Sequence, residues 1–195
     1  MLKRLFALIL VALIAIGGGT ALTYMSIRGA DQFGAVTLGG WTAYPTSGTP
    51  EADPYSKAML ARDAALALGI AEGITFFLDQ DAAGEPFSGS CDYVIEGNVP
   101  PARFWTLNIL DDQHRPLKIL NAELPSMLHS ANITYEPDDT LRLQLSARAR
   151  PGNWIQMPMG QNFALAMTLF DSPIASNKGL VDTAFPSVRK AGCRG

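Results

Sequence analysis

The longest hydrophobic segment of the chain lies at its N-terminus. An apolar run over residues 5–16 follows the basic pair Lys3-Arg4, and the next charged residue is Arg28. A basic start followed by an apolar stretch is typical of an export signal. An uncharged stretch of this length also suits a membrane span, which needs about 20 residues. Residues 1–29 are therefore predicted to be a signal peptide or a retained signal anchor.

The anchor is the preferred interpretation of this segment, because apolar character resumes at Leu22 and because Tyr24, an interfacial type of residue, precedes Arg28. Cleavage after the small residues 19–21 is the alternative that stays open. Either interpretation places the rest of the chain outside the cytoplasm.

Helical periodicity occurs once in the part that follows. Residues 30–52 are rich in Gly, Thr and Pro and are predicted to be an extended arm or linker. Asp53 is a good N-cap, Pro54 suits the first helical turn, and Gly69 is a C-terminal stop signal. Small side chains at helical spacing predict a stripe that lies close to a sheet: Ala58, Ala61, Ala65 and Leu68.

Strand-length runs dominate from residue 70 onward. In one of them, residues 141–147, leucines alternate with Arg142, Gln144 and Ser146, which indicates a strand with one face in water. Turn residues separate the runs, which are 74–78, 92–96, 102–110, 133–135, 141–147 and 163–170. This spacing predicts a mainly β domain over residues 53–195, a jelly-roll-like antiparallel β-sandwich with one N-terminal amphipathic helix.

The distribution of charge argues against one class of function, nucleic-acid binding. The chain has 195 residues and a formal charge of -3, but residues 1–30 hold three of the 15 basic residues and no acidic one. The remainder therefore carries 12 basic against 18 acidic residues, or -6. Its arginines are scattered along the sequence, so nucleic-acid binding is not expected.

The two cysteines, Cys91 and Cys193, leave two alternatives open. In an oxidising compartment they are able to form a disulfide that ties down the C-terminal tail, and otherwise they are two separate thiols. There is no CxxC motif and no His/Cys cluster in the sequence, so neither a redox role nor a bound metal is expected.

Three segments, in the right order, resemble the bacterial family catalogued as domain of unknown function 1214. Its opening resembles Gly40–Pro45 followed by Ala52–Tyr55 and Arg62. Its central strand resembles Phe104–Leu107 followed by Asp111. Its closing segment resembles Asn153-Trp154 followed by Pro158, Phe163 and Leu165.

The resemblance implies a jelly-roll sandwich in the bacterial envelope, either as a stand-alone protein or behind a companion domain. It implies no activity, so no catalytic residue and no cofactor is carried over. It makes a companion envelope protein a natural partner. Leu110 departs from the family pattern, which has an aromatic residue before the Asp.

Paired carboxylates are the candidates for catalysis. Asp111-Asp112 and Asp138-Asp139 each offer two acids of the kind that glycoside hydrolysis requires, but both pairs fall at predicted turns. Asp79, Asp81 and Glu85 form a candidate calcium loop, for which a solvated turn is the alternative. The only histidines, His114 and His129, have no partner at a motif spacing.

One set of residues combines aromatic rings with planar hydrogen-bonding groups and is a candidate binding surface: Tyr55, Arg62, Trp105, Asn153 and Trp154. The alternative is that both tryptophans are core residues, that Asn153 caps a turn and that Arg62 makes a structural ion pair. Trp41 is a further candidate, which either fixes the arm to the domain or anchors a partner.

The sequence thus favours a non-catalytic binding or interaction module on the outer side of the bacterial inner membrane. It is expected to be single-pass with its domain in the periplasm, or else secreted to the periplasm. The expected partners are a companion envelope protein and a glycan or lipid component, besides the membrane that holds the N-terminal helix. The alternative function is a polysaccharide hydrolase or lyase that uses the paired carboxylates.

Overall fold

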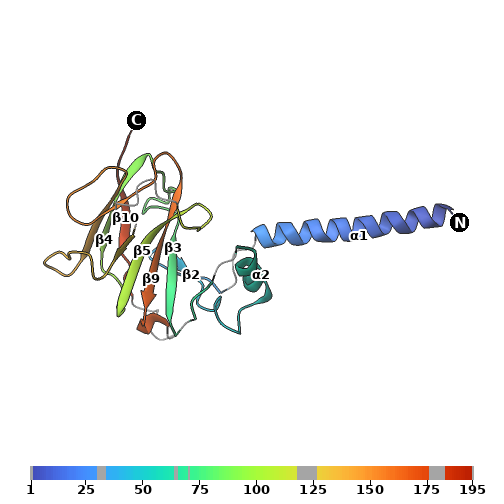
Figure 1. The fold of residues 1–195 in the computed structure, drawn as a ribbon, viewed down its shortest axis with the longest axis horizontal. Helices are drawn as coiled ribbons and strands as arrows, with labels where there is room; N and C mark the ends of the chain where they lie inside the picture. The colour runs from blue at the N-terminus through green and yellow to red at the C-terminus, as the bar shows by residue number, and fades with distance from the viewer. Residues whose placement is uncertain are drawn as a thin grey trace.

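The computed structural model of the chain describes residues 2–29, 34–63, 66–69, 71–117, 127–175 and 183–194 (Figure 1). Its first element is the helix α1 (Leu2–Gly29), which projects away from the rest of the molecule in Figure 1. Leu2–Met25 is long and apolar enough to cross a membrane, and a signal sequence has the same properties. The predicted apolar N-terminal helix is confirmed, and the choice between anchor and signal peptide stays open.

Two β-sheets make up most of the remaining chain. The six-stranded sheet has the order β1 (Val36–Leu38), β2 (Trp41–Ala43), β3 (Gly73–Leu78), β9 (Phe163–Phe170), β5 (Phe104–Asp111) and β6 (Met127–His129). The four-stranded sheet has the order β10 (Ser187–Cys193), β4 (Cys91–Gly97), β7 (Leu141–Ser146) and β8 (Trp154–Gln156). All neighbouring strands are antiparallel except β7 and β8, which are parallel.

The inner faces of both sheets contribute to one hydrophobic core. In β7 the leucines at 141, 143 and 145 are fully buried, as their alternation with polar residues predicts. Tyr93 and Ile95 of β4 join the same cluster, together with Phe76 of β3 and Leu107 of β5. The mainly β, two-sheet fold class is therefore confirmed, with one parallel pair in place of a wholly antiparallel arrangement. The jelly-roll connectivity stays a prediction.

The predicted arm is wrong for residues 36–43, which form the hairpin β1–β2 and pair with β3. The turn residues Gly39 and Gly40 have φ of 57° and 88°, the left-handed region that a two-residue hairpin loop requires. The glycines that suggested a linker thus serve a tight turn. Trp41 is 0% exposed and its indole N–H donates to the Pro186 carbonyl over 2.9 Å, so it fixes this segment to the domain.

The predicted helix is present but short. In α2 (Pro54–Asp63), Asp53 Oδ1 accepts hydrogen bonds from the backbone N–H groups of Tyr55 and Ser56, at 2.8 and 3.1 Å, which confirms the N-cap. The helix ends at Asp63 rather than near Gly69, and Ala61 is exposed, so the predicted sheet-facing stripe is wrong. Ala65 lies outside the described residues. The remaining element is the 3₁₀ turn η1 (Pro173–Ala175).

Candidate functional site

Both predicted carboxylate pairs are turn residues. Asp111 ends β5 and its carboxylate accepts hydrogen bonds from the N–H groups of Gln113 and Arg115 and from the Arg115 guanidinium, at 2.8–2.9 Å. Burial alone would raise the pKa of Asp111, but these bonds outweigh it and lower the pKa. Asp138 accepts from the backbone N–H and the hydroxyl of Thr140, at 3.2 and 2.7 Å. These carboxylates hold the backbone of their own turns.

The candidate calcium loop is organised in the same way. Asp81 accepts hydrogen bonds from the N–H groups of Ala83 and Glu85, and both Asp81 and Glu85 pair with the ammonium group of Lys190. Asp79 Oδ1 lies 2.6 Å from His114 Nε2. Within the described ranges, no three His, Cys, Asp or Glu side chains are grouped so as to hold a metal ion.

Three residues of the candidate binding surface, Trp105, Asn153 and Trp154, make contacts within the domain. Trp105 is 3% exposed and its indole N–H donates to the Tyr135 hydroxyl over 3.1 Å. Trp154 is 8% exposed and its indole N–H donates to the Ser146 carbonyl over 3.0 Å. The Asn153 amide joins two segments, because it donates to the Thr134 and Arg142 carbonyls and accepts from the Thr134 N–H. Trp105 is part of the hydrophobic core, as the alternative states, whereas Trp154 is buried outside that cluster and Asn153 joins two segments instead of capping a turn.

Tyr55 and Arg62, the other two candidates, lie on α2 and are exposed. Trp105 and Trp154 are on strands of different sheets with their rings buried. The five side chains therefore do not present one concave aromatic surface to solvent. A binding role for Tyr55 and Arg62 stays a prediction.

The two cysteines form a disulfide. Cys91 begins β4 and Cys193 ends β10, and the two residues are direct partners in the antiparallel register. The bond joins positions 102 residues apart and fixes β10, the edge strand of the four-stranded sheet, to its neighbour β4. Of the two alternatives that the sequence left open, the disulfide is the one observed. A stable disulfide is typical of oxidising compartments.

The outer face of the four-stranded sheet carries a concentration of arginine that the sequence did not predict; we call it the charged face. Asp92 and Glu96 lie on the same side of β4, because side chains alternate along a strand and the intervening odd positions are buried. Each carboxylate has two arginine partners. Asp92 pairs with Arg150 and Arg194, at 2.7 and 3.3 Å.

Glu96 pairs with Arg142 of β7, at 3.4 Å, and with Arg189 of β10. Four arginines thus share two carboxylates, which leaves a local excess of two positive charges. The chain as a whole has a net charge of -3. The charged face therefore has the opposite sign to the protein that carries it, so it attracts anions locally.

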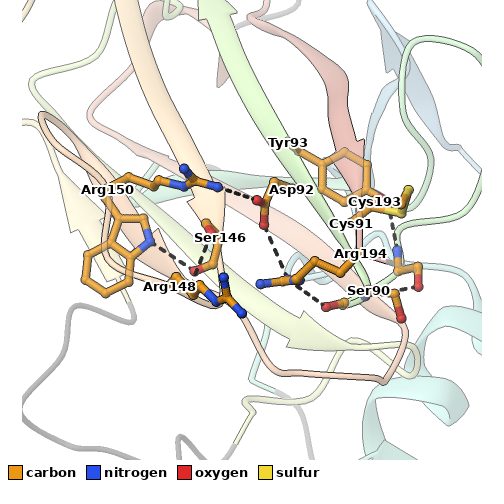
Figure 2. Close-up of polar contacts among 12 residues, drawn as sticks. Ser90, Cys91, Asp92, Tyr93, Ser146, Arg148, Arg150, Cys193 and Arg194 are labelled. Carbon is orange, nitrogen blue, oxygen red and sulfur yellow. Dashed lines mark hydrogen bonds and ion pairs between the residues drawn. A yellow bond between two sulfur atoms is a disulfide. The ribbon is translucent and has the colours of Figure 1, made fainter.

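A short connection brings Arg150 to Asp92. Residues 147–153 join the parallel strands β7 and β8, so this segment has to run back along the sheet before β8 begins. It contacts the charged face through the Gln144 amide, which donates to the Pro151 carbonyl over 3.0 Å. The Arg148 N–H donates to the Ser146 hydroxyl over 3.2 Å. Figure 2 shows the result, with Arg150 and Arg194 approaching Asp92 from different sides.

The Asp92 side chain is only 19% exposed, and it stays ionised in this setting. Burial alone would raise the pKa of Asp92, but the Arg150 guanidinium, the Ser146 hydroxyl and the Arg194 charge together lower the pKa below its usual value. Among the described residues, Asp92 Oδ1 is one of the few buried side-chain oxygens that have no hydrogen-bond donor. We call Asp92, Ser146, Arg150 and Arg194 the Asp92 cluster.

A hollow of about 330 Å³ lies at the Asp92 cluster. Ligand pockets in proteins start at about this volume. Its lining comes from three strands and the β7–β8 connection: Asp92, Tyr93, Val94, Gln144, Leu145, Ser146, Arg150, Ala191, Gly192, Cys193 and Arg194.

Sequence reasoning missed this site because its arginines are far apart along the chain. The alternation in 141–147 correctly places Arg142 on the face in water. The pairing of β10 with β4, and of β8 with β7, brings the other arginines to the same face. The position of Arg194 directly after Cys193 is the one available signal, since a disulfide to Cys91 places residue 194 near residue 92.

The chain is thus a two-sheet β domain that follows an apolar N-terminal helix and carries the charged face on one sheet. The family described as "Protein of unknown function (DUF1214)" matches residues 72–174, more than half of the chain, and the chain belongs to this family. The resemblance found in the sequence is thereby confirmed. No curated protein matches the chain.

Two solved structures match the chain, and the first of them shows a similar fold. The VPA0106 protein from Vibrio parahaemolyticus is 20% identical with a TM-score of 0.58, over 72% of this chain and 36% of that one. An uncharacterized protein from Burkholderia cenocepacia is 18% identical with a TM-score of 0.40, over 60% of this chain and 28% of that one. The chain thus spans about a third of the length of these proteins.

Proposed function

We propose that this protein is an exported, non-catalytic binding module that uses the charged face to bind an acidic glycan of the envelope. The observation that carries the proposal is the sharing of two carboxylates by four arginines on one face of an otherwise acidic domain. Arginine forks suit carboxylates and phosphates, because their N–H donors match the geometry of these groups.

The proposed location is the outer side of the bacterial inner membrane, with α1 as the anchor. An apolar helix that follows a basic start and a disulfide in the domain support this placement. Secretion of the cleaved domain to the periplasm is the other form of the same proposal. In both forms the charged face meets components of the envelope.

A polysaccharide hydrolase or lyase is less well supported. Such an enzyme needs two carboxyl groups on either side of a bound sugar, about 5–10 Å apart. Asp111 and Asp138 are instead engaged by the N–H groups of their own turns. Asp92 is flanked by two guanidinium groups and its pKa is lowered, which makes it a poor general acid.

The test is retention of the full-length protein, in zwitterionic nanodiscs, on immobilised polygalacturonate. We expect retention that is lost at high salt, and a lower elution salt for the double variant Arg142→Ala/Arg189→Ala. The matched control is Arg103→Ala/Arg115→Ala, which removes the same charge from arginines that pair with Asp171 and Asp111. We expect the control to elute like the wild type.

Two outcomes would contradict the proposal. If both double variants lose retention equally, overall charge rather than the charged face determines binding. If the nanodisc-embedded protein passes through the column and instead clusters vesicles rich in anionic phospholipid, lipid is the ligand. Release of unsaturated uronate from soluble polygalacturonate, followed by ultraviolet absorbance, would support the lyase alternative.

A companion envelope protein is a second candidate partner. The observation in its favour is that the Vibrio parahaemolyticus protein of similar fold is much longer, since the chain covers only 36% of it. We propose that this chain binds a companion envelope protein related to the additional part. The test is a pull-down from detergent-solubilised membranes, with the tag inserted at residues 137–139 so that Arg194 is not disturbed. One stoichiometric companion is expected, and recovery of the tagged protein alone would contradict the proposal.

A further inference from the structure

The hollow at the Asp92 cluster contains guanidinium donors that the ion pairs of the charged face do not use up. Arg150 and Arg194 each direct one guanidinium nitrogen, Nη2, at Asp92. Arg194 Nη2 also donates to the Gly89 carbonyl over 3.2 Å. A guanidinium group has five N–H donors, so both arginines retain donors for a further oxyanion.

The cluster is also not a self-sufficient ion-pair network. Asp92 Oδ1 is buried and, in the described part of the chain, receives no hydrogen bond, although a guanidinium nitrogen lies 3.3 Å away. Buried polar atoms in native proteins are normally satisfied, so an exception at the wall of a hollow points to a functional constraint.

The other walls of the hollow are partly polar. Gln144 adds an amide, a group that pairs with hydroxyls of a sugar. Val94 and Leu145 also line the hollow, so an occupant meets both polar and apolar surface there. The volume of about 330 Å³ corresponds to a small ligand.

The disulfide lies directly beneath the cluster. Cys91 and Cys193 each immediately precede a member of it, Asp92 and Arg194. Cys91 belongs to the buried core, and the next residue along a strand points the other way, into the charged face. The Arg194 N–H donates to the Ser90 carbonyl over 2.8 Å, which extends this pairing by one residue (Figure 2). The bond and this hydrogen bond therefore hold the backbone of Arg194 next to β4.

We propose that the hollow at the Asp92 cluster binds the carboxylate or phosphate group of an acidic sugar through Arg150 and Arg194, and that the Cys91–Cys193 disulfide holds Arg194 in place for this contact. The inference rests on the proposed function and names its binding subsite. Arg150 and Arg194 contact the ligand, and Asp92 is a positioning residue that orients both guanidinium groups.

Saturation-transfer NMR on glucuronate, with the full-length protein in zwitterionic nanodiscs at low ionic strength, tests the contact. We expect saturable binding of glucuronate, none of glucose, and displacement of glucuronate by inorganic phosphate, because the two anions use the same donors. Arg150→Ala and Arg194→Ala are each expected to weaken binding about tenfold or more, since a charged hydrogen bond is lost. Arg103→Ala, at an exposed ion pair elsewhere, is the matched control and is expected to bind like the wild type.

Asp92→Asn separates a ligand site from a structural cluster. It keeps the shape of the side chain but removes a negative charge beside both arginines, so we expect glucuronate to bind about threefold more tightly or better. Thermal unfolding of each variant shows whether the fold is kept. Equal binding of glucuronate and glucose, or wild-type affinity in both arginine variants, would overturn the proposal.

Reduction of the disulfide tests the positioning role. We expect a reductant to weaken glucuronate binding in the wild type and to cause no additional loss in Arg194→Ala, because that variant lacks the side chain that the bond positions. An equal loss in both proteins would overturn this role.

The two binding assays distinguish this proposal from the proposed function. If polygalacturonate is retained through Arg142 and Arg189 but Arg150→Ala and Arg194→Ala have no effect on glucuronate binding, the proposed function is supported and the binding subsite is ruled out. If glucuronate binds but polygalacturonate is not retained, the subsite is supported and the proposed function is ruled out.

Discussion

The two outer faces of the domain are built on the same alternation but have opposite chemistry. On the six-stranded sheet the positions that alternate with core residues hold threonines, alanines and larger apolar residues such as Phe77, Phe104 and Phe170, and we call this the threonine face. Thr75, Thr168 and Thr106 lie opposite one another on β3, β9 and β5, and the hydroxyls of Thr75 and Thr168 are 3.0 Å apart. On the four-stranded sheet the equivalent positions include Asp92, Glu96, Arg142 and Arg189, and Arg150 and Arg194 join them from outside the strands.

This difference separates the residues that stabilise the fold from the residues that we propose bind a ligand. The inward residues of both sheets are equally apolar and form one core. Next to the threonines, Ala164 and Ala166 of the central strand β9 are buried even though they face outward. The threonine face therefore needs no charge to be stable. The charged face contains an unsatisfied carboxylate oxygen and an excess of positive charge, which stability alone does not require.

The largest expected effect on stability comes from removing the Cys91–Cys193 disulfide, which joins β10 to β4 at the edge of the charged face. The double variant Cys91→Ser/Cys193→Ser should lower the free energy of unfolding by about 4 kcal/mol, because the bond closes a long loop in the unfolded chain. Denaturant titration followed by tryptophan fluorescence measures it. A loss below about 1 kcal/mol would show that β10 is held by its strand pairing without the bond.

A charge placed on the threonine face should be costly. Ala166→Asp puts a carboxylate at a buried position of β9, and its register neighbours Phe77 and Asn108 supply no cation. We expect a loss of about 3 kcal/mol, since an unpaired buried charge is poorly solvated. Thermal unfolding compares this variant with Ala166→Ser, which should be close to the wild type. Equal stability of Ala166→Asp and Ala166→Ser would contradict the contrast between the two faces.

Removal of the central carboxylate of the charged face should have a moderate effect. Asp92→Ala leaves Arg150 and Arg194 close together without their shared partner, so we expect a loss of about 2 kcal/mol at neutral pH. Because the pKa of Asp92 is lowered by folding, its contribution is fully present above its unfolded pKa.

The same contribution is lost as the pH falls through the folded pKa of Asp92, which is below its usual value. The stability difference between the wild type and Asp92→Ala should therefore shrink only in acid. A difference that disappears near neutral pH would contradict the assignment of Asp92 as an ionised carboxylate.

The smallest effect is expected at the other carboxylate of the charged face. The Glu96 side chain is 30% exposed and its two arginine partners are 60% and 61% exposed, so Glu96→Gln should cost about 0.5 kcal/mol. Thermal unfolding at low and high salt measures it, and the cost should decrease at high salt. A loss as large as that of Asp92→Ala would mean that the two carboxylates are equivalent.

The sequence predicts this fold well where one pattern determines one element. The alternation at Leu141, Leu143 and Leu145 identifies β7 and its buried face, and Asp53 identifies the start of α2. The prediction is wrong where the same residue types occur in two different structures. Gly39 and Gly40 have the composition of a linker, but they form the turn of a hairpin that places Trp41 in the core.

The charged face is less predictable because it depends on strand register. Arg142 is predicted to face solvent, but its neighbours Arg189, Arg150 and Arg194 arrive through the pairing of β10 with β4 and through the β7–β8 connection. Register follows from long-range packing rather than from local pattern. The candidate aromatic surface is not present because the rings of Trp105 and Trp154 are buried, as those of large aromatic side chains usually are.

The most direct measurement is amide chemical-shift mapping of the isotope-labelled full-length protein in nanodiscs during titration with a galacturonate trimer. We expect shifts confined to the charged face, strongest near Asp92, Ser146 and Arg194, with the resonances of Thr75, Thr106 and Thr168 unchanged. Shifts centred on the threonine face, or equal shifts with an uncharged glucose trimer, would contradict it.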